Sequence, residues 1–156
     1  MNSYATTLSG LMLLAATASA DAAGEVVIGP VDAQPAAKGP VENFTGSVLV
    51  TSRFRGTEPA RVSGGVVSFE PGAHTAWHTH PLGQTLVVTE GEGRVQDWGG
   101  PAHKIKVGDT VWIPPGVKHW HGAAPDSSMS HVAIAEALDG KTVEWMEKLT
   151  PEQYRD

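Results

Sequence analysis

Short stretches of alternating apolar and polar residues recur along the chain from residue 44 to residue 137. They predict strands at 47–50, 64–70, 85–90, 94–98, 104–107, 110–113, 119–123 and 129–137. In the second stretch the alternation places Gly65, Val67 and Phe69 on one face. No stretch with helical periodicity interrupts the series, so we expect an all-β domain.

The segments between these strands are rich in turn-forming residues. Residues 91–93 are expected to form a turn and Gly99-Gly100 a hairpin turn. A polar loop is expected at 53–61, where three arginines form a solvated cluster. This order of elements predicts a double-stranded β-helix, in which two antiparallel sheets close into a small jelly-roll-like barrel.

Both ends of the chain differ from this pattern. Residues 1–20 combine a short apolar run with an Ala-Ser-Ala cleavage site and read as a signal peptide, which predicts a periplasmic or secreted protein. Residues 1–7 contain no Lys or Arg, so a mis-assigned start and a cytoplasmic protein stay the alternative. We expect 21–43 to be a poorly ordered leader with one edge strand near 26–28, and 44–156 to be the domain.

The C-terminal tail predicts the one helix of the domain. Thr150 is a capping residue, Pro151 occupies the first helical position and Gln153 the third, which favours a short helix. The apolar tail around Trp145 and the short edge strands predict a homodimer or homotetramer.

Composition narrows the classes of function. The 156 residues suffice for one domain with a sizeable core, and a net charge of −6 argues against a nucleic-acid partner. The apolar run at 8–18 is too short to span a membrane, so no span is expected in the mature protein. With no cysteine in the chain, neither thiol chemistry nor disulfides contribute.

A cluster of histidines supplies the candidate chemistry. On an extended strand His78 and His80 point to the same side, and Gln84 follows after a turn. His119 follows a Pro-Pro-Gly turn that starts another strand. Three imidazoles and an amide oxygen without a thiolate favour a divalent ion, with manganese or iron preferred over zinc or nickel.

Four further histidines are placed by the same alternation. His121 shares the interior with His119, where it can hydrogen-bond a ligand or substrate, and His131 is in phase with interior positions of the last long strand. His74 shares the parity of His78 and is expected at the barrel mouth, whereas His103 follows a turn and is expected to be exposed. A hydrogen-bonded structural role is the default for a lone histidine on a strand.

The spacing of these residues resembles the two motifs of the cupin superfamily. Gly72, five residues, His78-Thr79-His80, three residues, Gln84, six residues and Gly91 are similar to the first motif, with glutamine where many cupins carry glutamate. Gly108, five residues, Pro114-Pro115-Gly116, two residues and His119 are similar to the second motif, whose final asparagine is Ala123 here. The resemblance implies a metal-binding barrel.

Longer segments are similar to the bacterial cupin hydroxynitrile lyases, which are manganese-dependent and cleave or form (R)-cyanohydrins such as mandelonitrile. The resemblance extends from about residue 39 to the end and is carried by 69–72, 75–86, 118–125, 138–141 and 152–155. It implies the metal ligands His78, His80, Gln84 and His119, the base His131, and the substrate-pocket positions Gly65, Val67 and Ala135. The strand alternation adds His121 to the expected pocket. Ala135 and Gly65 stand where the family carries glutamine and alanine.

Other classes of function share these features. A metal-dependent isomerase, decarboxylase or dioxygenase uses the same barrel, although an oxygenase usually has a ferrous site with a carboxylate ligand. A non-catalytic periplasmic protein that binds a small molecule is the third class. In all three the expected partner is a small molecule.

Overall fold

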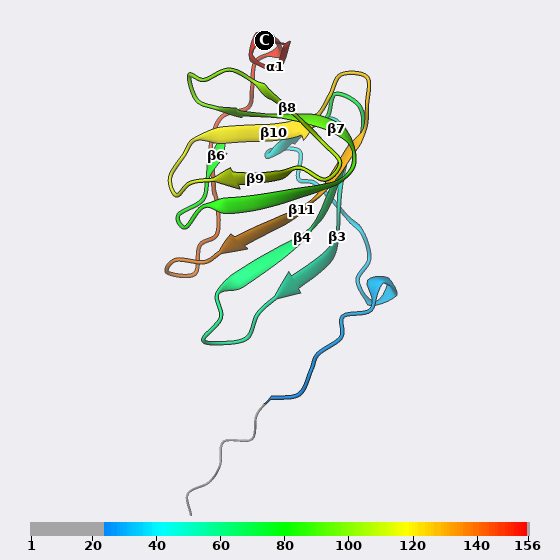
Figure 1. Ribbon diagram of the computed structural model, residues 1–156, viewed down its shortest axis with the longest axis vertical. Helices are drawn as coiled ribbons and strands as arrows, with labels where there is room; N and C mark the ends of the chain where they lie inside the picture. Colours follow the sequence, from blue (N-terminus) through cyan, green and yellow to red (C-terminus); the bar gives the residue numbers. More distant parts are fainter. Residues whose placement is uncertain (1–23, 156) are drawn as a thin grey trace, which may run out of the picture.

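The strands of the protein curl into an antiparallel half-barrel (Figure 1). The computed structural model describes residues 24–155. Its strands are β1 Ala37–Lys38, β2 Phe44–Thr45, β3 Val48–Arg55, β4 Val62–Phe69, β5 His74–Thr75, β6 His78–Thr79, β7 Gln84–Asp97, β8 His103–Lys106, β9 Thr110–Ile113, β10 His119–Ala123, β11 Met129–Glu136 and β12 Glu144–Trp145. Its helices are the 3-10 turn η1 Val31–Ala33 and the C-terminal helix α1 Pro151–Arg155.

The sheet has the strand order β1-β3-β4-β11-β7-β10-β5-β2. All of its pairings are antiparallel, and β8 and β9 both add to β7 while β6 joins β10 to β12. The predicted all-β double-stranded β-helix with one short C-terminal helix is therefore confirmed. Among the described residues, no helix has the length and apolar character needed to cross a membrane.

Strand β7 runs through both layers of the barrel, and the predicted turn at 91–93 is wrong. The strand continues unbroken for 14 residues, pairing with β11 through Gly91 and with β10 from Gly93 onward. Gly91 has a φ of +66° and bends the strand without reversing it. Turn-forming glycines at this point thus carry the chain from one layer to the other.

Replacing Gly91 with alanine is expected to lower the free energy of unfolding by about 2–4 kcal/mol, because a left-handed φ disfavours any Cβ and the new methyl group would collide with the Ser128 carbonyl. Gly99 is a matched control, since its φ is +84° and no atom lies within 4 Å of its added Cβ. Gly99→Ala should cost about 1 kcal/mol. Urea unfolding of both variants measures the difference, and equal losses would contradict the proposed collision.

Strand β3 extends further than predicted. Residues 53–55 were expected in a polar loop but continue this strand, so the loop prediction is wrong for them. The pairing with β4 shifts by one residue between Thr51 and Phe54, and Ser52 has a φ of +46°. This is a β-bulge, and the pattern of polar and apolar residues does not predict it.

The leader supplies an edge strand at a different place from the predicted one. Val26, Val27 and Ile28 are 92%, 87% and 81% exposed and belong to no strand. The edge strand is β1, which pairs with Val50 and Leu49 of β3. The apolar β-branched run at 26–28 has the propensity for a strand but no sheet edge beside it. The predicted signal peptide lies outside the described residues.

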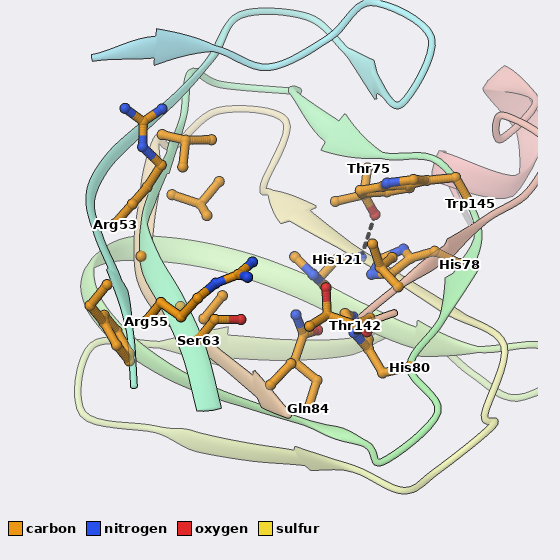
Figure 2. Close-up of a pocket in the computed structure, with 18 of the residues that line it drawn as sticks. Arg53, Arg55, Ser63, Thr75, His78, His80, Gln84, His121, Thr142 and Trp145 are labelled. Atoms are coloured by element: carbon orange, nitrogen blue, oxygen red, sulfur yellow. Dashed lines mark hydrogen bonds between the residues drawn. The ribbon is translucent and has the colours of Figure 1, made fainter. Parts of the chain in front are cut away.

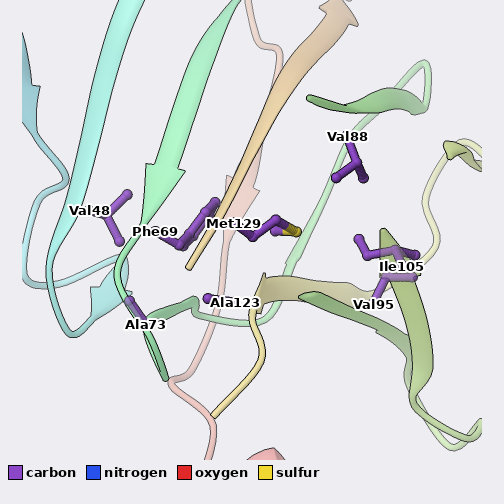
Figure 3. Packing of buried hydrophobic residues seen from close by; sticks show 8 residues of the cluster. All are labelled: Val48, Phe69, Ala73, Val88, Val95, Ile105, Ala123 and Met129. Carbon is purple, nitrogen blue, oxygen red and sulfur yellow. The ribbon is translucent and has the colours of Figure 1, made fainter. Parts of the chain in front are cut away.

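Along β4 and β11 the inward-facing side chains pass from the apolar core to the border of a cavity. A buried apolar cluster fills one part of the barrel (Figure 3) and consists of Val48, Phe69, Ala73, Val88, Val95, Ile105, Ala123 and Met129. Two residues after Met129 on β11 the buried side chain is His131, and two residues before Phe69 on β4 the half-buried Val67 lies at the edge of a cavity. The period of two therefore places core and cavity side by side on the same strands.

The C-terminal helix begins as predicted. The Thr150 hydroxyl accepts a hydrogen bond from the Gln153 amide at 3.3 Å, and the Gln153 side-chain oxygen accepts one from the Thr150 amide at 2.9 Å. This reciprocal pair is a capping box. Tyr154 then packs on the cluster of Trp77, Trp120 and Leu149 and holds the tail against the barrel.

Candidate metal centre

Three histidines from two parts of the chain converge on one point. His78 lies on β6 directly opposite His119 of β10, and His80 follows β6 with the same parity as His78. One ring nitrogen from each residue lies within 4.8 Å of the other two, and all three side chains are buried. This distance allows one ion to contact all three nitrogens.

Hydrogen bonds set which ring nitrogen of each histidine is free. The Nδ1 atoms of His78 and His119 lie 2.9 Å from the carbonyls of Ala76 and Val117, and His80 Nδ1 lies 2.6 Å from the Thr142 carbonyl. A carbonyl only accepts, so each Nδ1 carries the proton and donates it. Each Nε2 therefore offers a lone pair, as in histidines that bind metals.

Burial keeps the three imidazoles neutral at pH 7. Desolvation lowers the pKa of His78 well below 6.5, and the neighbouring His119 lowers it further. Desolvation also lowers the pKa of His119 to about 4 and lowers that of His80, although the carbonyl that accepts from each ring opposes the shift. Neutral imidazoles are the form that binds a cation.

Gln84 adds an oxygen beside the three nitrogens. It opens β7, and its side-chain oxygen lies 3.4 Å from His119 Nε2. His80 Nε2 is buried and has no hydrogen-bond partner among the described residues, an arrangement that costs free energy unless a ligand satisfies it. Three neutral nitrogens and an amide oxygen fit a divalent transition ion.

A cavity of about 640 Å³ opens beside this centre (Figure 2). Apolar side chains line much of it, including Phe44, Val50, Val67, Val143 and Trp145. All four residues predicted for the substrate pocket border it, namely Gly65, Val67, His121 and Ala135. His78, His80 and Gln84 also border it, so a small molecule in the cavity would reach the candidate metal centre.

His121 and His131 form a buried pair behind one wall of the cavity. His131 is fully buried and does not border the cavity, whereas His121 does. His131 Nε2 lies 3.1 Å from His121 Nδ1. Burial, the largest cause, lowers the pKa of His121 well below 6.5 and the pKa of His131 to about 4. Both are neutral at pH 7, and of the two only His121 borders the cavity, since the Nδ1 of His131, which has no hydrogen-bond partner within residues 24–155, is buried.

His74 does not lie at the barrel mouth, so that prediction is wrong. Its ring is buried and stacks on Tyr154 at a centroid distance of 4.5 Å. His74 pairs with Gly122 and His78 with His119, so a step of four residues along this segment matches a step of three along β10. Because of the extra residue, the side chains of His74 and His78 point to opposite faces. His103 is exposed, as predicted.

Several residues at the site carry no signal in the local sequence. The tail after residue 140 brings Thr142, which accepts the bond from His80, and Trp145, whose ring centroid lies 4.7 Å from that of His78. Arg53 and Arg55 of β3 also border the cavity. Each reaches the site through the long-range path of the chain, which the neighbouring residues do not encode.

Comparison with known proteins agrees with this architecture. The sequence model of the cupin domain matches residues 65–134. An (R)-mandelonitrile lyase from Granulicella tundricola is 58% identical over 125 residues, which cover 80% of this chain and 95% of that protein. The crystal structure of a cupin-like protein from Thermotoga maritima is 44% identical, covers 78% of this chain and 92% of that chain, and has a TM-score of 0.72. A polyketide cyclase from Streptomyces resistomycificus, 15% identical with a TM-score of 0.64 over 84% of this chain and 92% of that chain, shares the fold alone.

Proposed function

Because this chain belongs to the cupin family, we propose that it is a metal-dependent lyase that cleaves and forms cyanohydrins, with manganese as its ion. The observation that carries the proposal is the set of three converging histidine nitrogens beside a cavity in a chain 58% identical to an (R)-mandelonitrile lyase. His78, His80, His119 and Gln84 would hold the ion. A divalent ion bound by neutral ligands supplies a positive charge that lowers the pKa of a substrate hydroxyl.

His121 is the residue placed to take the hydroxyl proton. It borders the cavity, and its Nδ1 is engaged with His131, so its Nε2 is the nitrogen that can accept. When the proton moves to His121, the oxygen forms the carbonyl and the electron pair of the carbon–carbon bond leaves with cyanide. The imidazolium then returns the proton to cyanide. The base implied by the family resemblance, His131, would accept the Nδ1–H bond of His121 and stabilise its charged form.

The apolar walls suit an aryl or alkyl substituent. Val67 and Val143 offer branched aliphatic surface, and Trp145 offers an aromatic ring beside His78. Gly65 and Ala135 contribute little bulk, so this end of the cavity stays wide. These features support a substrate with an organic group larger than methyl.

Cyanide release from mandelonitrile tests the proposal. Protein stripped of metal and reloaded with manganese is expected to release cyanide at least about 100-fold faster than the stripped protein, because the ion activates the hydroxyl. Chiral analysis of the reverse reaction should give an excess of the (R)-cyanohydrin. Absence of cyanide release by metal-loaded, folded protein would overturn the proposal, and metal-dependent oxygen uptake would favour the dioxygenase alternative.

A further inference from the structure

The wall of the cavity carries an unbalanced positive charge. Arg53 and Arg55 border it together with neutral histidines, and no aspartate or glutamate among residues 24–155 lines it. The chain as a whole has the opposite balance, with 17 acidic against 11 basic residues. The chain is acidic, yet among its described residues the cavity is lined by two arginines and by no carboxylate. Such a wall favours a negatively charged ligand.

The β-bulge in β3 brings Arg55, whose side chain is exposed, to the border of the cavity. Before the bulge the inward residue Val50 pairs with inward Val67, so strict alternation would make residue 54 face inward and 53 and 55 face outward. The extra residue shifts the alternation by one for Arg55, and Phe54 beside it also borders the cavity. Arg55 pairs with Ser63 instead, which pairs in turn with Ala135 of β11, and both of these residues border the cavity.

The position of Arg55 matches this register. In Figure 2 its guanidinium extends across the cavity in the direction of Thr142 and the histidines, whereas Arg53 is turned towards the leader. Arg53 donates to the Pro35 carbonyl at 3.4 Å. Within residues 24–155, Arg55 has no salt bridge and no side-chain hydrogen bond. Its five donors are thus available to a ligand.

The backbone at the bulge adds a second observation. Ser52 holds a φ of +46°, a conformation that costs a residue with a Cβ about 1–2 kcal/mol. Strain of this kind persists where the surrounding structure requires it, and it concentrates at ligand sites. Here its consequence is the inward direction of Arg55.

We propose that the substrate of this cavity carries a carboxylate, which Arg55 binds through its guanidinium while the substrate hydroxyl lies at the histidine cluster. The inference rests on the proposed function in taking this cavity as the substrate site, and it deepens that function by naming the class as hydroxy compounds with a separate carboxylate. The planar guanidinium matches a carboxylate with two parallel hydrogen bonds. The apolar walls between the two ends would hold the connecting carbon skeleton.

Binding of two ligands that differ only in charge tests the proposal. The ligands are 4-(hydroxymethyl)benzoate and its neutral analogue 4-(hydroxymethyl)benzamide, titrated by calorimetry into manganese-loaded protein. We expect the parent to bind the benzoate at least about tenfold more tightly, as a charge-assisted bidentate pair should give. Arg55→Gln should reduce this ratio below about threefold, Arg55→Lys should retain part of it, and the matched control Arg61→Gln, outside the cavity wall, should keep the parental ratio.

Each outcome separates this inference from the proposed function. Equal affinity for the two ligands in the parent, no detectable binding of either, or a benzoate preference that survives in Arg55→Gln would overturn the carboxylate site; the last result would assign the carboxylate to the metal ion. Mandelonitrile cleavage is measured on the same preparations. Cleavage with equal affinities would leave the lyase function standing without the carboxylate site. An Arg55-dependent preference without cleavage would support the site and overturn the lyase function.

Discussion

His80→Ala is expected to release the metal ion that the parent protein retains. His80 contributes one of only three converging imidazole nitrogens among the described residues, and its Nε2 is buried without a hydrogen-bond partner in that part of the chain. Loss of a supporting contact behind a ligand already costs about 10–100-fold in metal affinity, so loss of the ligand itself should cost at least about 100-fold. Elemental analysis should find about one transition ion per parental chain and almost none in the variant.

The matched control is His103→Ala, which removes an exposed histidine from β8. Its metal content should equal that of the parent. Circular dichroism of His80→Ala should show the same β-sheet content as the parent, because the apolar cluster around Phe69 and Met129 does not include His80. Equal metal in the parent and His80→Ala would contradict the assignment of this centre.

His121→Ala is expected to lower kcat for mandelonitrile cleavage by about 10²–10⁴-fold, the usual contribution of a general base. The KM should change less than kcat, since the remaining cavity wall still holds the substrate. His131→Ala should lower kcat by about 10–100-fold, because it removes the hydrogen bond that orients His121. His131→Gln, whose amide oxygen can accept the Nδ1–H bond, should recover part of this loss, which a purely structural role of His131 would not predict.

Metal content and melting temperature are measured on all three variants, so that loss of the ion or of folded protein is separated from loss of proton transfer. A larger loss in metal-loaded His131→Ala than in metal-loaded His121→Ala would return the role of base to His131, as the family resemblance implies. Near-parental cleavage by both folded, metal-loaded variants would refute proton transfer through this pair.

Local sequence was sufficient for the parts of the molecule that depend on neighbouring residues. The period of two at His78 and His80 predicted a shared side, and the same period placed His121 with His119. The Thr150–Gln153 capping box predicted the start of α1 to the residue. These features are determined within a few residues, where the geometry of a strand or a helix end leaves little freedom.

Features that depend on the register between distant strands were predicted wrongly or not at all. Gly91 predicted a turn but bends a continuous strand, because the strands on either side of it belong to different layers. The four-residue step from His74 to His78 pairs with a three-residue step from Gly122 to His119. The side chain of His74 therefore lies on the face opposite to that of His78. A one-residue slip exchanges the two faces of a strand, so parity alone cannot be carried across a bulge.

The sequence by itself determined the class of fold, the positions of most of the longer strands and the set of candidate metal ligands, because the hydrophobic pattern and the motif spacing are local properties. Only the tertiary structure decided what surrounds those ligands. It placed His131 behind His121, brought Thr142 of the tail to His80, and turned Arg55 into the cavity. Each of these contacts joins residues from separate strands or loops, and pairing across the whole barrel sets their distance and direction.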